Sequence, residues 1–451
     1  MERPLAYLKQ RADDDWLIGY NSRQFTQMAE QFYLELTQHL HQGTAGKIFL
    51  AERNPVHFQA RFVAACLSGY PVFLCNPNWV KQEWQQVFEL VQTDLIVDYG
   101  YSGWIMIPTG GSSGQIRFAI HTWETLMASV QGFRQYFQIN QVNSLCVLPL
   151  YHVSGLMQFL RSFTTGGSLA IMPFKELEAG KKCNIDPAEF FISLVPTQLQ
   201  RLLENPALAK WLSQFKTVLL GGAPAWPELL QQARHHSIRL APTYGMTETA
   251  SQIVTLKPED FLNGNNSCGQ VLPHAQVTIR SATGEILTSN QIGTITIEAQ
   301  SQALGYYPEL LTSHNTFQLD DLGFLDPQGY LNIIGRSSNK IITGGENVYP
   351  SEVEAAIRAT KMVNDVCVIG IPDRHWGQVV TAVYVPSNSA IATTAIQAAI
   401  EDKLSKFKQP KHWISVETLP RNYQGKINRE QLLKLATASL QIHPIESVTQ
   451  T

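Results

Sequence analysis

Hydrophobic and polar positions predict alternating helices and strands in the first 220 residues. The stretch FQARFVAACLSG (58–69) has the spacing of an amphipathic helix that ends at Gly69, and YPVFLC (70–75) predicts a strand. Three runs are almost continuously apolar and have helix-like sequence between them: LCVLPL (145–150), FFISLV (190–195) and KTVLLGG (216–222). Such runs are typical of buried parallel strands joined by crossover helices.

The pattern changes twice further along the chain. Between 269 and 335, the segments AQVTIR, GTITIEA and GYLNIIG predict a small antiparallel or barrel-like subdomain. After about residue 336, we expect a helix with a Ser351–Glu354 capping box, two strands (363–371 and 379–385) and a lysine-rich helix over 394–408. We therefore predict an α/β fold with an α+β part: an N-terminal domain of parallel-rich sheets (1–337) and a small, mobile C-terminal α+β domain (338–451).

Composition narrows the possible functions. The 451 residues are 44% hydrophobic and 16% charged, and the net charge of -3 argues against a nucleic-acid scaffold, which needs a basic surface. We find neither a run of about 20 apolar residues nor an apolar signal core, so we expect no membrane span and a cytoplasmic location. The six cysteines form no CxxC pair and are expected to be free thiols, not metal ligands.

Two segments in the N-terminal domain have residues suited to nucleotide chemistry. In IPTGGSSGQIRFA (107–119), glycines expose backbone N–H groups that could surround a polyphosphate, although a plain surface loop is an equal interpretation. In APTYGMTETAS (241–251), a glutamate beside a threonine suits Mg²⁺, and the tyrosine could face a purine. Taken alone, Glu248 is better explained as a carboxylate at the start of a helix.

Three further segments follow in order. DLGFLDPQGYLNIIGR (321–336) predicts a hairpin whose Asp321 and Arg336 could hold a ribose or form a surface ion pair. KIITGGENVYPSEVE (340–354) has two glycines before a helix, which could be a simple turn. PRNYQGKINR (420–429) places Lys426 in a loop, where a lone lysine is ordinarily solvated.

Together, the five segments resemble the core motifs of the acyl-adenylate-forming superfamily, in order and in spacing. This superfamily contains acyl- and aryl-CoA ligases, peptide-synthetase adenylation domains and firefly luciferase. The phosphate loop matches loosely and the other four segments match closely. Within the superfamily, four stretches resemble the 2-succinylbenzoate–CoA ligase family of menaquinone and phylloquinone biosynthesis: PLYHVSGL (149–156), SLVPTQLQRLL (193–203), KTVLLGGAP (216–224) and YGMTETASQIVTL (244–256).

The resemblance implies an AMP-forming acid–thiol ligase that uses ATP, Mg²⁺ and coenzyme A and forms an acyl-adenylate. It implies that Lys426, Glu248 and Thr247 are catalytic, with Glu248 as the metal ligand, and that Ser338 is the hinge between domains. The nucleotide- and coenzyme-binding residues that it implies are Thr109, Gly110, Gly111, Ser112, Ser113, Gly114, Arg117, Gly222, Ala223, Pro224, Tyr244, Gly245, Asp321, Arg336, Gly344 and Gly345. The candidates for holding the acid are His152, Ser193, Thr197, Gln198, Arg201, Ser251 and Gln252.

Three positions depart from the family pattern. Ile116-Arg117-Phe118 stands where the phosphate loop usually has Pro-Lys-Gly, Ser338 stands where the hinge usually has Asp or Lys, and Asp320 replaces a glycine. Arginine keeps the positive charge of lysine but presents a planar fork instead of an ammonium group. We expect the activity to survive these changes, with modest effects on nucleotide affinity.

Other functions remain to be weighed. A CoA ligase for another aryl or acyl acid is the nearest, although the polar SLVPTQ and TASQ segments disfavour the apolar tunnel of a long-chain enzyme. An amino-acid adenylation domain would carry an aspartate within 149–156, where this chain has none. A non-catalytic nucleotide-binding relative would have lost Lys426 or Glu248. Homodimers are common in the superfamily, and a homodimer is possible here.

Overall fold

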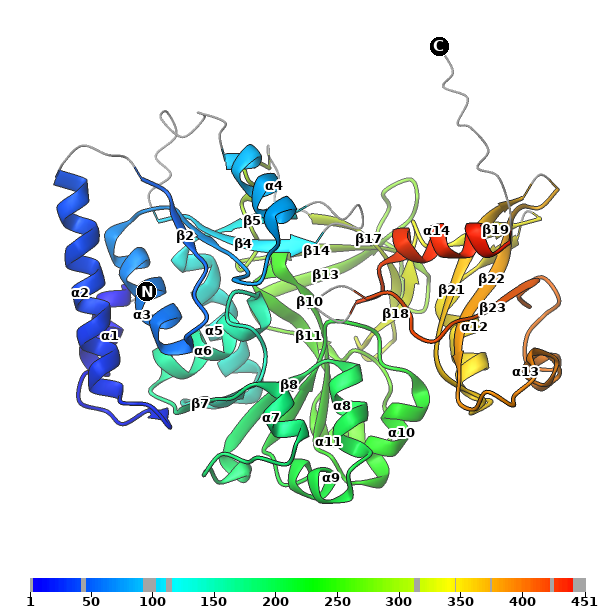
Figure 1. Ribbon diagram of the computed structural model, residues 1–451, viewed down its shortest axis with the longest axis horizontal. Helices are drawn as coiled ribbons and strands as arrows, with labels where there is room; N and C mark the ends of the chain where they lie inside the picture. Colours follow the sequence, from blue (N-terminus) through cyan, green and yellow to red (C-terminus); the bar gives the residue numbers. More distant parts are fainter. Residues whose placement is uncertain are drawn as a thin grey trace, which may run out of the picture.

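The computed structural model describes residues 3–41, 46–91, 103–110, 116–311, 317–344, 346–373, 375–421 and 426–440. The predicted α/β fold class is confirmed, because helices pack around sheets of which the largest is mostly parallel (Figure 1). The helices are α1 (Pro4–Gln10), α2 (Ser22–His41), α3 (Pro55–Ser68), α4 (Lys81–Val91), α5 (Trp123–Phe137), α6 (Val153–Thr165), α7 (Phe174–Glu178), α8 (Pro196–Leu203), α9 (Pro206–Leu212), α10 (Pro227–His235), α11 (Pro258–Leu262), α12 (Pro350–Arg358), α13 (Thr393–Ile400) and α14 (Arg429–Ser439), with short 3₁₀ turns η1 (Pro187–Glu189) and η2 (Thr247–Thr249).

An eight-stranded sheet positions most of the candidate residues. Its order is β1-β7-β6-β8-β9-β10-β11-β12, parallel as far as β10 and antiparallel beyond it. The strands are β1 (Leu17–Ile18), β6 (Asn143–Cys146), β7 (Leu169–Ile171), β8 (Phe190–Leu194), β9 (Thr217–Leu220), β10 (Leu240–Met246), β11 (Ser251–Thr255) and β12 (Gln270–Val271). The carboxyl ends of parallel neighbours meet at one edge, so the loops after β6, β8, β9 and β10 gather there.

A six-stranded sheet lies beside the first and has the order β16-β15-β5-β4-β3-β2. Its strands are β2 (Ile48–Leu50), β3 (Val72–Leu74), β4 (Ile105–Gly110), β5 (Ile116–His121), β15 (Gly305–Tyr306) and β16 (Glu309–Leu310). Strands β2, β3 and β4 are parallel, whereas β4, β5, β15 and β16 are antiparallel. This sheet therefore brings Tyr306 next to a strand nearly 190 residues earlier in the chain, with Ala119 as its partner.

The predicted antiparallel subdomain is confirmed as a four-stranded sheet of order β13-β14-β17-β18. Its strands are β13 (Ala275–Arg280), β14 (Gly293–Ala299), β17 (Phe317–Leu325) and β18 (Leu331–Arg336). The hairpin between β17 and β18 turns at Pro327-Gln328-Gly329, where Gly329 has a φ of 79° that favours glycine. The register of this hairpin places Asp321 directly opposite Arg336.

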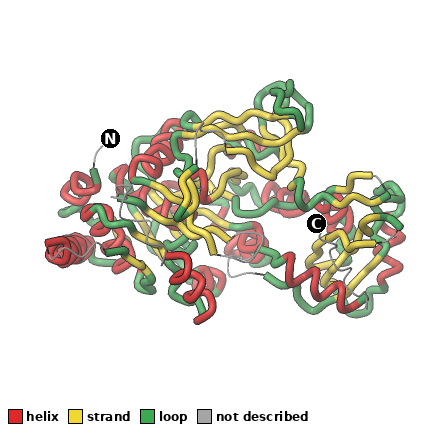
Figure 2. Tube along the Cα trace, turned by 90° about the horizontal axis from the view of Figure 1, so that it is seen from above, coloured by secondary structure: helices red, strands yellow, loops and turns green. Residues whose placement is uncertain are grey.

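The C-terminal unit has its own sheet and its own hydrophobic cores. Strands β20 (Glu346–Val348), β19 (Ile341–Thr343), β22 (Gly377–Pro386) and β21 (Val363–Asp373) form the sheet, and β23 (His412–Ser415) pairs with β22. Every core cluster of the described residues lies wholly before residue 340 or wholly after it. In Figure 2, this unit is the smaller lobe at the right. The boundary at 337/338 stays a prediction, which this separation supports.

The capping box predicted for the first helix of the C-terminal unit is wrong. Helix α12 begins at Pro350, one residue before the predicted start, so Ser351 lies inside the helix and cannot cap it. Its hydroxyl instead donates to the Ile334 carbonyl, and Glu354 accepts from the Val368 N–H. The Ser351–Glu354 pair therefore joins the helix to two different strands.

The lysine-rich helix predicted over 394–408 is shorter than expected. Helix α13 ends at Ile400, and the lysines beyond it lie in turns. Beyond the end of the helix, the Gln409 amide donates to the carbonyls of Glu401 and Leu404. The strand predicted over 145–150 is also wrong at its end, since β6 stops at Cys146.

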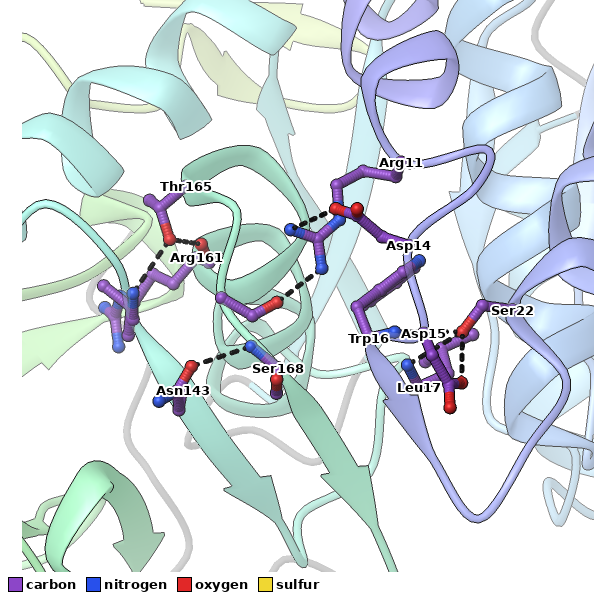
Figure 3. A network of polar contacts seen from close by, with 12 residues as sticks. Arg11, Asp14, Asp15, Trp16, Leu17, Ser22, Asn143, Arg161, Thr165 and Ser168 are labelled. Carbon is purple, nitrogen blue, oxygen red and sulfur yellow. Dashed lines mark hydrogen bonds and ion pairs between the residues drawn. The ribbon is translucent and has the colours of Figure 1, made fainter.

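The N-terminal segment is tied to the turn between α6 and β7 (Figure 3). Arg11 is 3% exposed, donates to the Gly167 carbonyl at 2.7 Å and lies 3.4 Å from the Asp14 carboxylate. Strand β1 then pairs with β7, in register Leu17 to Leu169. These contacts fix the end of α6, the helix that also carries Arg161.

The described chain has no helix that is both long and apolar enough to cross a membrane. All six cysteines are free thiols: Cys75, Cys146 and Cys367 are buried, and the other three are half-buried. Burial raises the pKa of Cys146, Cys268 and Cys367 to about 12, which makes these thiols unreactive.

Candidate active site

Glu248 lies on the short turn η2, at the carboxyl end of the eight-stranded sheet, and is 9% exposed. The backbone just after it is strained, because Ala250 and Ser251 have φ angles of 50° and 95°. Such conformations in non-glycine residues cost about 1–3 kcal/mol each and persist only where surrounding contacts impose them. The turn is therefore held in one shape by its neighbours.

Four donors from different parts of the N-terminal domain hold this turn. His121 Nε2 contacts the Thr247 carbonyl at 2.8 Å, and the Ser129 hydroxyl donates to the Ala250 carbonyl at 2.7 Å. Two further bonds reach the turn, from the Ser301 hydroxyl to the Thr249 carbonyl and from the Ala303 N–H to the Glu248 carbonyl. Burial lowers the pKa of His121 to about 4, so its imidazole is neutral and can donate from Nε2.

The Glu248 carboxylate receives hydroxyl groups from two strands of the six-stranded sheet. The Tyr306 hydroxyl donates to Glu248 Oε1 at 2.6 Å, and the Thr109 hydroxyl lies 3.5 Å from the same oxygen. The Arg117 guanidinium stacks on the Tyr306 ring, 3.8 Å from its centroid. Two residues of the predicted phosphate loop, Thr109 and Arg117, are thus next to the predicted metal ligand.

Only part of the remaining phosphate loop lies within the described residues. Gly110 ends β4, and its register partner Ile116 begins β5. The other predicted residues of this loop lie outside the described residues: Gly111, Ser112, Ser113 and Gly114.

Asp321 and Tyr244 form the centre of the predicted ribose site. Asp321 is 8% exposed, and its two oxygens accept from the Tyr244 hydroxyl at 2.7 Å and from Arg336 Nε at 3.0 Å. Burial, and then the charge of Asp321, raise the pKa of Tyr244, which therefore remains a donor. The aspartate is held by a neighbouring strand and by its hairpin partner.

Tyr244 and Gly245 sit at a bulge in the pairing of β10 with β11. A Cβ atom at Gly245 would lie 2.2 Å from the Ser251 carbonyl oxygen, so only glycine fits here. Gly222, Ala223 and Pro224 are exposed and follow the carboxyl end of β9, the neighbour of β10. The predicted adenine-site residues therefore lie at the same edge of the sheet as Tyr244.

Lys426 comes from the C-terminal unit and reaches this edge. Its pKa is lowered, first by the desolvation of its ammonium group and then by Arg336, while Glu248 and Asp321 act in the opposite direction. In turn, burial and the charge of Lys426 lower the pKa of His152 to about 3. The lysine is therefore within electrostatic range of a glutamate, an aspartate and a histidine that precede it by more than 100 residues.

The predicted hinge residue Ser338 and the predicted coenzyme-binding residue Gly344 have contacts of their own. Ser338 is exposed, and its N–H donates to the Asp320 carboxylate at 3.0 Å and 3.2 Å, while its hydroxyl contacts the same group. Gly344 has a φ of 58°, and a Cβ atom there would lie 2.8 Å from the Trp376 ring. Gly345 lies outside the described residues.

The structure separates the seven substrate candidates into two groups. Ser251 and Gln252 lie on β11, directly after the Glu248 turn, and Gln252 is 5% exposed. His152 is 7% exposed and immediately precedes α6. Ser193 lies within β8 and Thr197 within α8, and both are half-buried.

Two candidates have other partners. Arg201 points to the outer side of α8, where its side chain is 57% exposed and its Nη1 lies 3.6 Å from Glu178. Gln198 Oε1 accepts from the Val195 N–H and so caps the start of α8. The structure therefore does not bring Arg201 to the other candidates, and Gln198 is engaged at the helix terminus.

Sequence reasoning missed Arg161, which is 2% exposed on α6. Its Nη2 donates to Gln252 Oε1 at 2.9 Å and to the Ser251 hydroxyl at 3.2 Å, and its guanidinium stacks 4.2 Å from the Phe133 ring. One signal was available, since this arginine is the single charged residue in the sequence of α6. Tyr306 was also missed, and no spacing in the sequence points to it.

Comparison with known proteins gives the family of the chain. The family model of AMP-binding enzymes matches residues 103–307, and the model of the AMP-binding enzyme C-terminal domain matches 352–426. A 2-succinylbenzoate–CoA ligase from Enterococcus faecalis is 35% identical over 331 residues, which cover 72% of this chain and 68% of the relative. Another from Oceanobacillus iheyensis is 35% identical over 340 residues, which cover 73% and 69%.

Solved structures agree on the fold. The o-succinylbenzoate CoA synthetase of Bacillus subtilis, in complex with its acyl-adenylate intermediate, has a TM-score of 0.80 at 24% identity and covers 94% of this chain and 97% of its own. ATP-bound MatB from Rhodopseudomonas palustris has a TM-score of 0.80 at 21% identity, with coverage of 96% and 98%. The chain therefore belongs to the family of AMP-binding enzymes that contains the 2-succinylbenzoate–CoA ligases.

Proposed function

We propose that this chain is an ATP-dependent 2-succinylbenzoate–CoA ligase of menaquinone or phylloquinone biosynthesis. It forms the acyl-adenylate with release of pyrophosphate, and then transfers the acyl group to coenzyme A with release of AMP. The observation that carries the choice of acid is the buried, positively charged Arg161 beside two of the predicted substrate residues. The curated relatives support the same choice by their names.

Arg161 suits the second carboxylate of this acid. Burial lowers its pKa to about 9, so the guanidinium is still charged at neutral pH. Among the described residues, its contacts are with neutral groups, and its Nε has no hydrogen-bond partner. A buried charge without a counter-charge is costly, and an anionic substrate group would relieve that cost. Monocarboxylic acids, including fatty acids, offer no such group.

A second buried polar side chain, His274, lies within electrostatic range of Arg161. His274 is 6% exposed, and neither of its ring nitrogens has a hydrogen bond within the described chain. The pKa of His274 is lowered to about 4, first by burial and then by the charge of Arg161. A neutral imidazole next to a guanidinium can donate a hydrogen bond to a carboxylate or a ketone.

The residues of the site fit a magnesium ion bound together with ATP. The described chain has no group of three or more His, Cys, Asp or Glu residues that could hold a metal ion by themselves. Magnesium sites in enzymes that use ATP commonly need only one or two carboxylates, because phosphate oxygens and waters complete the shell. We assign Glu248 as that carboxylate, with the hydroxyl of Thr247 beside it. When bound, the metal neutralises phosphate charge.

The remaining roles follow from the positions of the side chains. We assign Asp321 and Arg336 to the ribose, Tyr244 to the adenine face, and Lys426 to the charge that develops on the α-phosphate during carboxylate attack. Ser338 is assigned as the pivot, and Gly344 and Gly345 as the coenzyme A side of the C-terminal unit.

The first test is pyrophosphate release by the purified protein with ATP and Mg²⁺. The acids to compare are 2-succinylbenzoate, benzoate, 4-coumarate, octanoate and palmitate, each with and without coenzyme A. Preference for 2-succinylbenzoate, with AMP and its CoA ester as products, is the expected result. Preference for another acid would remove the substrate assignment and leave an acyl-CoA ligase.

A matched pair of acids tests the role of Arg161 directly. The compound 4-oxo-4-phenylbutanoate has the side chain of 2-succinylbenzoate but lacks the ring carboxylate. In Arg161→Gln, kcat/KM for 2-succinylbenzoate should fall by about 100-fold, the size of a lost buried charge pair, while the poor value for 4-oxo-4-phenylbutanoate should change little. An equal loss with both acids would assign Arg161 to packing, and Arg201→Gln serves as the exposed control.

A further inference from the structure

Tyr306 is the one phenol that contacts the Glu248 carboxylate among the described residues. It lies on β15, whose pairing with β5 fixes the backbone at the register Tyr306 to Ala119. The hydroxyl-to-Oε1 distance of 2.6 Å is that of a strong hydrogen bond to an ionised acceptor. This hydrogen bond therefore links Tyr306, on a rigid strand, to the Glu248 carboxylate, which we assign as the metal ligand.

The protonation state of Tyr306 suits a permanent donor. A phenol ordinarily keeps its proton up to about pH 10, so the Tyr306 hydroxyl is a donor at neutral pH. The Thr109 hydroxyl approaches the same oxygen, Oε1. Within the described chain, both hydroxyl contacts thus fall on one oxygen, and Oε2 is left as the oxygen that can face a metal.

Arg117 packs against the face of the Tyr306 ring. Its guanidinium lies 3.8 Å from the ring centroid, within the range of a cation–π contact. A cation on the ring face draws electron density from the phenol and makes its O–H a better donor. Arg117, which stands where the family's phosphate loop usually has lysine, therefore influences Glu248 through its contact with Tyr306.

We propose that Tyr306 is a positioning residue, which orients the Glu248 carboxylate so that Oε2 is presented to the magnesium ion of Mg–ATP. This proposal rests on the metal-binding role assigned to Glu248 under the proposed function. Outer partners that orient a metal ligand typically contribute 10- to 100-fold to metal affinity. Removal of the hydroxyl should therefore weaken the binding of Mg–ATP but not of AMP, which needs no metal.

The test is Tyr306→Phe, which keeps the ring and its contact with Arg117 and removes only the oxygen. Calorimetric titration of the purified protein should show Mg–ATP binding weakened about tenfold or more, and AMP binding unchanged. The Mg²⁺ concentration that gives half-maximal pyrophosphate release should rise by a similar factor. Tyr307→Phe is the matched control, because Tyr307 is 4% exposed and packs in the core at 5.0 Å from the Phe73 ring.

Three outcomes would overturn the proposal. Wild-type Mg–ATP binding in Tyr306→Phe would show that the hydroxyl does not position the carboxylate. Equal weakening of Mg–ATP and AMP would assign the residue to the structure of the nucleotide site. Glu248→Gln separates the premise from the inference. If the Mg²⁺ dependence of Glu248→Gln is that of the wild type, the metal-binding role of Glu248 is wrong. If the Mg²⁺ dependence changes in Glu248→Gln but not in Tyr306→Phe, only the positioning role of Tyr306 is wrong.

Discussion

The glutamate side and the lysine side of the site are built in different ways. Glu248 lies on a strained turn that is bonded by side chains and backbone groups from several elements of the N-terminal domain. Lys426 belongs to a unit with a separate sheet and separate cores, and it comes near the site from outside that domain. One side of the site is fixed by packing, and the other depends on how two bodies meet.

Few polar contacts between described residues cross from one body to the other. At the predicted hinge, Ser338 bonds to Asp320, and Ser351 donates to the Ile334 carbonyl at 2.9 Å. Farther away, the Arg358 guanidinium lies 5.1 Å from the Trp226 ring. Partly exposed contacts of this kind are each worth about 1 kcal/mol, so the two bodies can take another arrangement at a small cost in free energy.

This difference suits a reaction in two halves. Metal, phosphate and ribose must stay aligned throughout, which favours groups on a rigid scaffold. The charge that assists carboxylate attack is needed only in the first half, and its removal afterwards opens the way for a thiol. A lysine on a weakly attached unit and a glutamate on a fixed turn meet these two requirements.

The largest expected effect comes from the lysine. Lys426→Ala should slow adenylate formation by about 1,000-fold, because the developing charge on the α-phosphate loses its counter-charge. Thioester formation from preformed acyl-adenylate should be nearly unchanged. The two half-reactions can be followed separately, by pyrophosphate release and by appearance of the CoA ester.

Lys406→Ala is the control, since Lys406 is an exposed lysine of the same unit that lies in a turn. It should be indistinguishable from the wild type in both halves. Equal loss of both half-reactions in Lys426→Ala would contradict the division between a fixed and a movable side.

The hinge gives a smaller effect. Asp320→Ala removes the acceptor for the Ser338 N–H and hydroxyl, which we expect to loosen the arrangement that brings Lys426 to the site. Loss of about 1 kcal/mol should slow adenylate formation about fivefold and leave thioester formation unchanged or faster. Asp326→Ala is matched to it, because Asp326 also accepts backbone N–H groups but only within its own hairpin turn. Identical behaviour of the two variants would argue against a hinge role for Asp320.

The sequence predicted the local structure around the site better than the contacts between distant segments. The strand after which Gly222 stands was predictable, because a buried parallel strand needs a continuous apolar run. The pairing of Asp321 with Arg336 followed from the Pro-Gln-Gly turn, which sets the register of the hairpin. Local chemistry was sufficient for both.

Contacts between distant segments could not be predicted in this way. Tyr306 meets Glu248 only because β15 adds to the edge of a sheet made by the first 121 residues. Arg201 was predicted as a substrate candidate and Arg161 was not, yet the packing of α8 turns Arg201 outward to Glu178. The capping box failed for a local reason, since Pro350 begins the helix one residue earlier.

The smallest expected effect concerns the fixed side and its dependence on pH. His121 is fully buried and neutral beneath the Glu248 turn, with its pKa lowered to about 4 by burial. Between pH 6.5 and 4 the unfolded chain binds a proton there that the folded chain does not, so stability present above pH 6.5 is lost as the pH falls. At pH 5.5 this should amount to about 1 kcal/mol of the unfolding free energy.

His121→Gln keeps a donor for the Thr247 carbonyl and removes the titration. Its melting temperature should therefore fall less than that of the wild type when the pH is lowered from 7 to 5.5. His235→Gln, at an exposed position on α10, should keep the acid sensitivity of the wild type. If His121→Gln and the wild type lose the same stability over this range, the turn beneath Glu248 does not depend on a neutral histidine, and the fixed side is less tightly specified than its contacts indicate.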